Sequence, residues 1–270
     1  MTEWKFAYQT NCWGELGGNA EGVTSITQLN YRTFGDMDRA CSEIAAAGYT
    51  GVELFDGNLL DYSCADFRKL LANSGLSLVA VYSGANFIFD DILPEELARI
   101  TRAADRAAEL NAPHLVVGGG AKRFDGIRDT DYDKLGAALD RVKGLAEDRK
   151  LIAHYHPHLS TIVESPEQVS RIFELTEINF CPDTAHLAAA GGNPAQLIRD
   201  HADRISYIHL KGLQNKPFAF TPLDRGDVPT DPIIAAMRDT KFTGWVCTEL
   251  DAWDDPAEGA RASMEYLTQT

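Results

Sequence analysis

A regular alternation of short apolar runs with longer amphipathic segments constrains the fold of this chain more than any other feature. The apolar runs are rich in β-branched and aromatic residues and are apolar on both faces, which is typical of strands covered on both sides. The expected strands span residues 5–8, 51–55, 77–82, 114–118, 151–156, 179–182, 205–210 and 245–250. The segments between them have helical periodicity and span 36–47, 65–73, 94–110, 132–149, 166–175, 194–201, 231–240 and 256–267.

Eight strand-then-helix units predict a parallel sheet, and eight is the number of strands that closes a (β/α)8 TIM barrel. The 270 residues fit one such barrel, so we expect a single α/β domain over residues 1–270, with 14–28 as an extended first βα loop. An open doubly wound sheet is the alternative fold. It is disfavoured because the glycine-rich dinucleotide-binding turn is missing after the first strand.

The charge balance excludes several classes of partner. The chain has 25 Lys and Arg against 40 Asp and Glu, which gives a net charge of −15. Nucleic acids and anionic membranes attract cationic surfaces, so we expect neither as a partner. The five cysteines are scattered without a Cys-x-x-Cys pair, and the first residues show no basic start followed by an apolar run. These features predict a cytoplasmic protein with reduced thiols.

Polar residues gather where the predicted strands end. In a TIM barrel the βα loops at the carboxyl ends of the strands converge on the axis, and the chemistry is located there. Five of the seven histidines fall at such ends, namely His154, His156, His158, His186 and His209. Glu53, Asp183 and Glu249 also stand at strand ends, whereas His114 and His201 are expected to be structural. Each of these acids alone fits a structural role, such as an Asp that caps a helix.

Taken together, a histidine of the fifth strand, Asp183, His209 and Glu249 come from four consecutive strands and are expected to point into one cavity. Imidazoles and carboxylates packed this closely repel or desolvate one another unless a cation holds them. A mixed oxygen and nitrogen set without a thiolate suits Mn²⁺, Mg²⁺, Co²⁺ or Zn²⁺. His154, His156 and His158 alternate, so all three would face the same side of a continuing strand, and only one need be a ligand.

Several motifs of the chain resemble one known family. GVELFDG, HYHPH, CPDTAHLAAAG, ISYIHLKGL, PLDRGDV and FTGWVCTELD are similar to segments of the xylose-isomerase-like sugar isomerase/epimerase superfamily, and within it to the inosose dehydratases. The resemblance covers residues 51–251 and is strongest from His154 onward. It implies a divalent-metal barrel that acts on a small polyol or keto-sugar, with Mn²⁺ as the first candidate metal.

The resemblance also implies roles for individual residues. The family ligands carry over to His156, Asp183, His209 and Glu249, and His154 becomes a substrate-binding residue or an alternative ligand. Many members have a glutamate in place of the strand-five histidine, and this chain departs from them in the way that the dehydratases do. Lys211 matches a family lysine that contacts a substrate oxygen. Arg225 departs from a glycine-rich stretch of the dehydratases, which argues against an inositol-derived substrate.

A metal bound to a ketone and a neighbouring hydroxyl makes the adjacent hydrogen removable, so a base and an acid can complete a β-elimination. We therefore expect a lyase, such as a dehydratase, acting on a keto-cyclitol or 3-keto-sugar, with Glu53 or His158 as the base. Lys211 or His186 is expected to assist the oxygen that develops charge. The expected substrate-binding residues are Asn11, Trp13, Tyr82, Arg225 and His154.

Other classes of function stay open from the sequence. A sugar isomerase or 3-epimerase could use the same metal site, and a non-catalytic sugar-binding protein is a further alternative. A metal-dependent endonuclease is disfavoured because the net charge of −15 leaves no basic groove. A homo-oligomer is possible. The acidic segments 90–96, 125–133 and 251–258 are expected to form a solvated outer surface.

Overall fold

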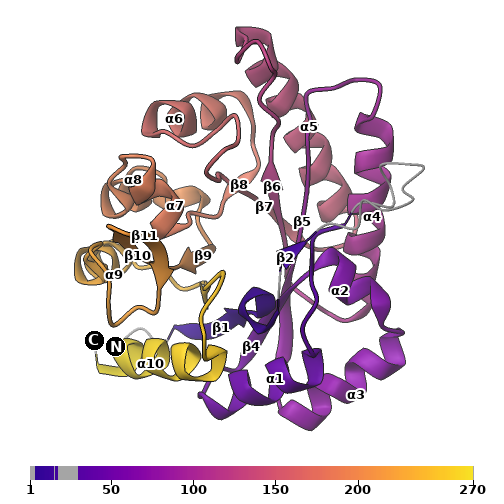
Figure 1. Ribbon diagram of the computed structural model, residues 1–270. Helices are drawn as coiled ribbons and strands as arrows, with labels where there is room; N and C mark the ends of the chain where they lie inside the picture. The colour runs from indigo at the N-terminus through magenta and orange to yellow at the C-terminus, as the bar shows by residue number, and fades with distance from the viewer. Residues whose placement is uncertain (1–3, 15, 18–29, 270) are drawn as a thin grey trace.

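The computed structural model describes residues 4–14, 16–17 and 30–269 (Figure 1). In this part of the chain an eight-stranded sheet has the order β8-β7-β6-β5-β4-β1-β12-β9. Its strands are β1 (Lys5–Gln9), β4 (Gly51–Phe55), β5 (Ser77–Ala85), β6 (His114–Gly119), β7 (Ile152–His156), β8 (Asn179–Phe180), β9 (Tyr207–Leu210) and β12 (Trp245–Thr248). The pairings are parallel, and a parallel bridge between Asp183 and His209 links the two edges of the sheet. This arrangement confirms the predicted TIM barrel.

Helices follow the strands and lie around the outside of the barrel (Figure 1). They are α1 (Met37–Ala46), α2 (Asp56–Asp61), α3 (Cys64–Ser74), α4 (Leu93–Glu109), α5 (Asp129–Glu147), α6 (Pro166–Leu175), α7 (Thr184–Ala189), α8 (Pro194–Asp200), α9 (Thr230–Asp239) and α10 (Pro256–Gln269). Local signals explain several starting points. Ser165 caps α6 through the amide of Gln168, and Asn193 caps α8 in the same way, each directly before a proline.

Some short elements differ from the predicted pattern. The helices α2 and α7 have only six residues each, too few for a periodic apolar stripe, and they lie outside the predicted helices. An antiparallel hairpin of β10 (Gly212–Asn215) and β11 (Phe218–Thr221) follows β9. The strands β2 (Leu16–Gly17) and β3 (Arg32–Thr33) also pair antiparallel. Most of the predicted first loop, residues 15 and 18–28, lies outside the described residues.

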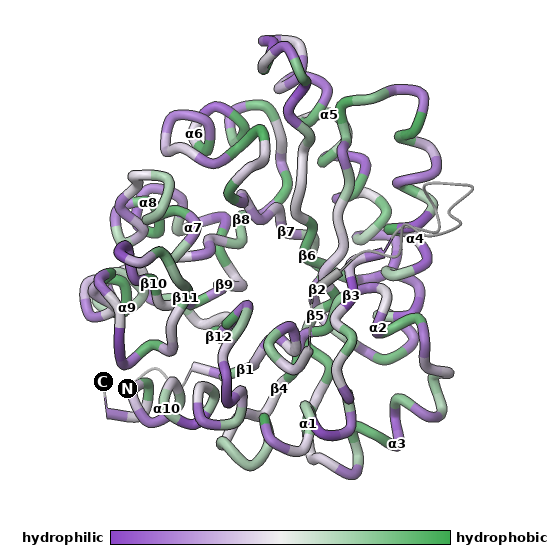
Figure 2. The backbone as a smooth tube through the Cα atoms, viewed as in Figure 1, coloured by the Kyte–Doolittle hydropathy of each residue, from purple (hydrophilic) through white to green (hydrophobic). Residues whose placement is uncertain are grey.

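The apolar side chains fill two layers. A large cluster lies between the strands and the helices, and a smaller one, which includes Ala7, Val79 and Tyr207, lies inside the barrel. Hydrophilic residues run along the outer turns of the helices (Figure 2). Within the described ranges, no helix is long and apolar enough to cross a membrane.

The expectation of a solvated surface for the acidic segments is partly wrong. Glu96 is fully buried because its carboxylate accepts hydrogen bonds from the backbone amides of Asn86 and Phe87. Asp131 is also buried, where it pairs with Arg123 at 2.8 Å. Charges buried in this way require such partners.

Candidate metal centre

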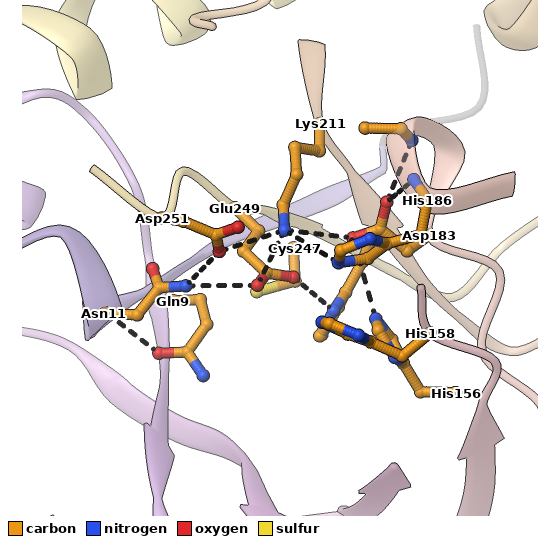
Figure 3. A network of polar contacts seen from close by, with 12 residues as sticks. Gln9, Asn11, His156, His158, Asp183, His186, Lys211, Cys247, Glu249 and Asp251 are labelled. Carbon is orange, nitrogen blue, oxygen red and sulfur yellow. Dashed lines mark hydrogen bonds and ion pairs between the residues drawn. The ribbon is translucent and has the colours of Figure 1, made fainter. Parts of the chain in front are cut away.

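Four of the sequence-predicted residues meet at the carboxyl ends of the barrel strands. His156, Asp183, His209 and Glu249 are all buried, and each offers one ligand atom within 4.8 Å of the other three. Figure 3 shows His156, Asp183 and Glu249 turned toward a common point. The structure therefore brings together one side chain from each of four neighbouring strand ends.

The local structure explains how these side chains are held. His156 is the last residue of β7, and Glu249 directly follows β12. Asp183 is the N-cap of α7, where its Oδ1 accepts hydrogen bonds from the amides of Ala185 and His186, each at 2.8 Å. This cap fixes the carboxylate and leaves Oδ2 directed at the cluster.

The hydrogen bonding of the cluster fits a metal ion. His156 Nε2, Asp183 Oδ2, His209 Nδ1 and Glu249 Oε2 are buried and have no hydrogen-bond partner among the described residues. His209 Nδ1 and Glu249 Oε2 are 2.7 Å apart, but the two groups are not aligned as a hydrogen bond requires. Buried polar atoms are normally paired, and two imidazoles with two carboxylates form a suitable donor set for a divalent cation.

Lys211 supplies the main positive charge beside these carboxylates. Its Nζ lies 3.0 Å from Glu249, 3.1 Å from Asp251 and 3.4 Å from Asp183. Dashed lines mark contacts of Lys211 in Figure 3. Burial acts to lower the pKa of Lys211, but the three carboxylates outweigh it and raise the pKa. Lys211 therefore stays cationic and holds the acids together.

A second row of polar residues lies behind the cluster. Glu53 Oε2 is 3.1 Å from His209 Nε2, and Gln9 Nε2 donates to Glu53 Oε1 at 3.3 Å. Burial acts to lower the pKa of His209, whereas Glu53 and Glu249 raise it to about 10. Glu53 is not part of the cavity lining, as Asp183 and His209 are not, and its role as the base stays a prediction.

A cavity of about 660 Å³ opens beside the cluster. Its lining includes Asn11, Tyr82, His156, His158, Glu249 and Asp251. His158 Nδ1 donates to the carbonyl of Leu159 at 2.7 Å, which leaves Nε2 as the proton acceptor of the neutral ring. Burial, with a smaller effect of His156, lowers the pKa of His158 to about 4. Near pH 7 this imidazole is therefore neutral.

His186 lies beside the cluster and outside the cavity lining. Its ring centroid is 3.8 Å from that of His158, and its Nε2 is 3.4 Å from Lys211 Nζ. His186 and Lys211 thus form the layer beneath His158. Within the lining, Asn11 donates to both Glu249 and Asp251, at 3.1 Å and 2.9 Å.

Three predicted substrate-binding residues do not reach the cavity. His154 is enclosed in the barrel, where its Nε2 is 3.0 Å from His114 Nδ1. The Trp13 indole donates to Glu43 at 2.6 Å. Arg225 pairs with Asp224 and Glu258 at 2.9 Å each. Among the described residues these three are therefore not part of the cavity lining, and their substrate-binding role stays a prediction.

The sequence reasoning missed polar residues of the cavity, among them Asp251, Glu96 and Arg99. Asp251 was assigned to a solvated segment, although its position after the eighth strand could have identified it by the strand-end rule. Burial raises the pKa of Asp251 to about 6, against the opposing effect of Lys211. Arg99 pairs with buried Asp56 at 3.0 Å, and no local pattern in α4 signals this contact.

The buried pair of His114 and His154 leads to a prediction on acid stability. Burial lowers the pKa of His114 from 6.5 to about 4, so the folded protein resists the proton that the unfolded chain accepts. Stability from this residue is therefore complete above about pH 6.5 and falls as the pH drops toward 4, by about 3 kcal/mol in total.

We expect His114→Asn, which keeps a hydrogen-bonding group toward His154, to reduce this pH dependence. Urea unfolding between pH 4 and 7 gives the free energy of unfolding as a function of pH. We expect the slope of this curve in the variant to correspond to about one proton fewer taken up on unfolding. An unchanged slope in the variant would contradict the assignment.

The fold and the cluster define a class of protein: a parallel (β/α)8 barrel with a four-residue candidate metal centre at the carboxyl ends of its strands. The model of the xylose isomerase-like TIM barrel family matches residues 41–270. The chain belongs to this family, which confirms the resemblance inferred from its motifs.

The similarity to known relatives and solved structures covers most of the chain. The inosose dehydratase of Geobacillus kaustophilus is 26% identical over 269 residues and covers 86% of each chain. A D-allulose 3-epimerase from Methylomonas sp. in complex with D-allulose has a TM-score of 0.78 at 16% identity, covering 100% of this chain and 98% of that chain. A probable 3-DHS dehydratase from Bacillus anthracis has a TM-score of 0.76 at 15% identity, covering 98% of each chain.

Proposed function

We propose that the protein is a divalent-metal-dependent carbon–oxygen lyase that dehydrates a keto-cyclitol or 3-keto-sugar. The observation that carries this proposal is a set of four buried atoms that have no hydrogen-bond partner in the described part of the chain, one from each of His156, Asp183, His209 and Glu249. The relatives named inosose dehydratase support the choice of reaction. Mn²⁺ is the proposed metal, and Co²⁺, Mg²⁺ or Zn²⁺ could also accept this donor set.

A divalent cation at this site would act as a Lewis acid toward the ketone of the substrate. The proton on the neighbouring carbon then needs a base at the cavity wall. His158 lines the cavity, is neutral near pH 7 and has Nε2 available, so we assign it this role. The proton taken by Nε2 can return to the departing hydroxyl group, so that the carbon–hydrogen and carbon–oxygen bonds break and water leaves.

The remaining polar residues are assigned to binding and orientation. Asn11 and Tyr82 line the cavity and can contact substrate hydroxyls. Lys211 and His186 lie beneath the wall, where Lys211 holds Asp251 and Glu249 in place.

An epimerase is the second candidate. Epimerisation needs proton-transfer groups on two sides of the substrate, and His158 after β7 and Asp251 after β12 line the cavity from different strands. The allulose epimerase structure shares the fold.

Product analysis separates the two reactions. With scyllo-inosose or a 3-keto-glucoside plus Mn²⁺, the lyase gives an enone absorbance and a product lighter by one water or by the aglycone. We expect EDTA to stop the reaction and Mn²⁺ to restore it. A product of unchanged mass would favour the epimerase, and no product with either substrate would contradict the proposed function.

A further inference from the structure

A continuous chain of buried hydrogen bonds joins two of the candidate ligands from behind. It begins at His209 Nε2, 3.1 Å from Glu53 Oε2, and continues through Gln9 Nε2, which donates to Glu53 Oε1 at 3.3 Å. The backbone amide of Asn11 donates to Gln9 Oε1 at 3.1 Å, and Asn11 Nδ2 donates to Glu249 Oε1, also at 3.1 Å. These linking residues lie on and after β1 and on β4, strands that provide no member of the four-residue cluster.

The chemistry of the groups determines the direction of each bond. An ionised carboxylate only accepts, so His209 must donate its Nε2 hydrogen to Glu53, and Nδ1 is the nitrogen left for the cluster. Gln9 accepts from a backbone amide through Oε1, which turns its Nε2 toward Glu53. At the far end, Asn11 occupies Oε1 of Glu249 and leaves Oε2 for the cluster.

We propose that Glu53 is a positioning residue, which acts through His209 directly and through Gln9 and Asn11 on Glu249, so that both ligands present the correct atom to a divalent cation. The proposal rests on the metal site of the proposed function. Residues that hydrogen-bond to a metal ligand from behind fix the orientation of its side chain. Their loss typically weakens metal binding by about 10–100-fold.

Glu53 could alternatively bind a second ion. Glu53, His209 and Cys247 also lie close enough together to share one. However, the facing atoms of Glu53 and His209 already bond to each other. The Cys247 thiol in addition donates to the backbone carbonyl of Thr248 at 3.8 Å. One cation per chain is therefore expected.

The test is a titration of the full-length protein with Mn²⁺ in competition with a chelator, which gives affinity and stoichiometry without activity. The isosteric Glu53→Gln change places an amide hydrogen against the Gln9 amide, and we expect it to weaken Mn²⁺ binding by about 10–100-fold. The double variant Gln9→Glu with Glu53→Gln exchanges donor and acceptor in the middle of the chain, so we expect it to recover most of the affinity. The control Asp131→Asn removes a buried carboxylate distant from the site and should leave the affinity unchanged.

The possible outcomes separate the positioning role from the metal site itself. Wild-type affinity in Glu53→Gln, or a double variant no tighter than Glu53→Gln, overturns the positioning role while the metal site stands. Two ions in the wild type, with one lost in Glu53→Gln, assigns Glu53 to a second site instead and also overturns it. A wild-type protein that binds no Mn²⁺ overturns the metal site and the inference together. Thermal unfolding of the metal-free variants identifies any effect that comes only from loss of structure.

Discussion

Asp183→Ala is expected to abolish binding of the divalent metal and to lower kcat/KM by about 1000-fold or more, because Lewis-acid catalysis supplies several kcal/mol of transition-state stabilisation. The carboxylate is fully buried, and its Oδ2 has no hydrogen-bond partner among the described residues, as expected of an atom that faces a metal ion. Metal content after dialysis and steady-state kinetics measure the two effects.

A matched variant separates the metal from the helix. Asp183 Oδ1 also caps α7, so alanine costs about 1 kcal/mol of stability in addition to the ligand. Asp183→Asn retains a carbonyl oxygen for the cap and removes the charge. We expect the asparagine variant to lack metal and to unfold close to the temperature of the metal-free wild type. Full activity in this variant would exclude Asp183 as a ligand.

Lys211→Met is expected to destabilise the metal-free protein by about 3–5 kcal/mol, the usual cost of removing one partner from a buried ion pair. Lys211 is 2% exposed, and without its ammonium group Asp183, Glu249 and Asp251 would remain close together in a buried site. Urea unfolding in EDTA measures the loss. Added Mn²⁺ should raise the unfolding temperature of the variant more than that of the wild type, because the cation replaces the missing charge.

An exposed lysine provides the control for this experiment. Lys143 pairs with Glu147 at 2.6 Å on the surface of α5, and Lys143→Met should change stability by less than about 1 kcal/mol. Equal stability of Lys211→Met and Lys143→Met in EDTA would contradict the central role of Lys211 in balancing the buried acids.

The barrel could be predicted from the sequence because its signals are local. The strand at Gly51–Phe55 and the helix at Pro166–Leu175 have the predicted bounds. Apolar runs and proline or serine at helix starts depend only on neighbouring residues. The helix α7 is not predicted by periodicity because its six residues are too few to form an apolar stripe. Its cap, Asp183, also forms the isolated parallel bridge with His209.

The candidate metal centre was predictable for a related reason. In a parallel barrel every strand end faces the same opening, so position along the strand is enough to place Asp183, His209 and Glu249 together. Side-chain partners from distant parts of the chain could not be predicted. Trp13 donates to Glu43 and Arg225 pairs with Glu258, contacts that no periodicity encodes.

The choice between the alternating histidines also needed the three-dimensional structure. His154 and His156 lie on the same face of β7, as alternation predicts, but at different depths in the barrel. His154 meets the ring of His114, whereas His156 reaches the cluster at the strand end. Depth along the axis depends on how neighbouring strands are staggered, which the sequence of one strand does not contain.

Anomalous diffraction from crystals of this protein grown with Mn²⁺ would test the metal centre most directly. The account predicts one strong peak per chain, bounded by His156 Nε2, Asp183 Oδ2, His209 Nδ1 and Glu249 Oε2, the four buried atoms without hydrogen bonds among the described residues. A peak at another position, or no peak at a Mn²⁺ concentration that supports activity, would contradict it.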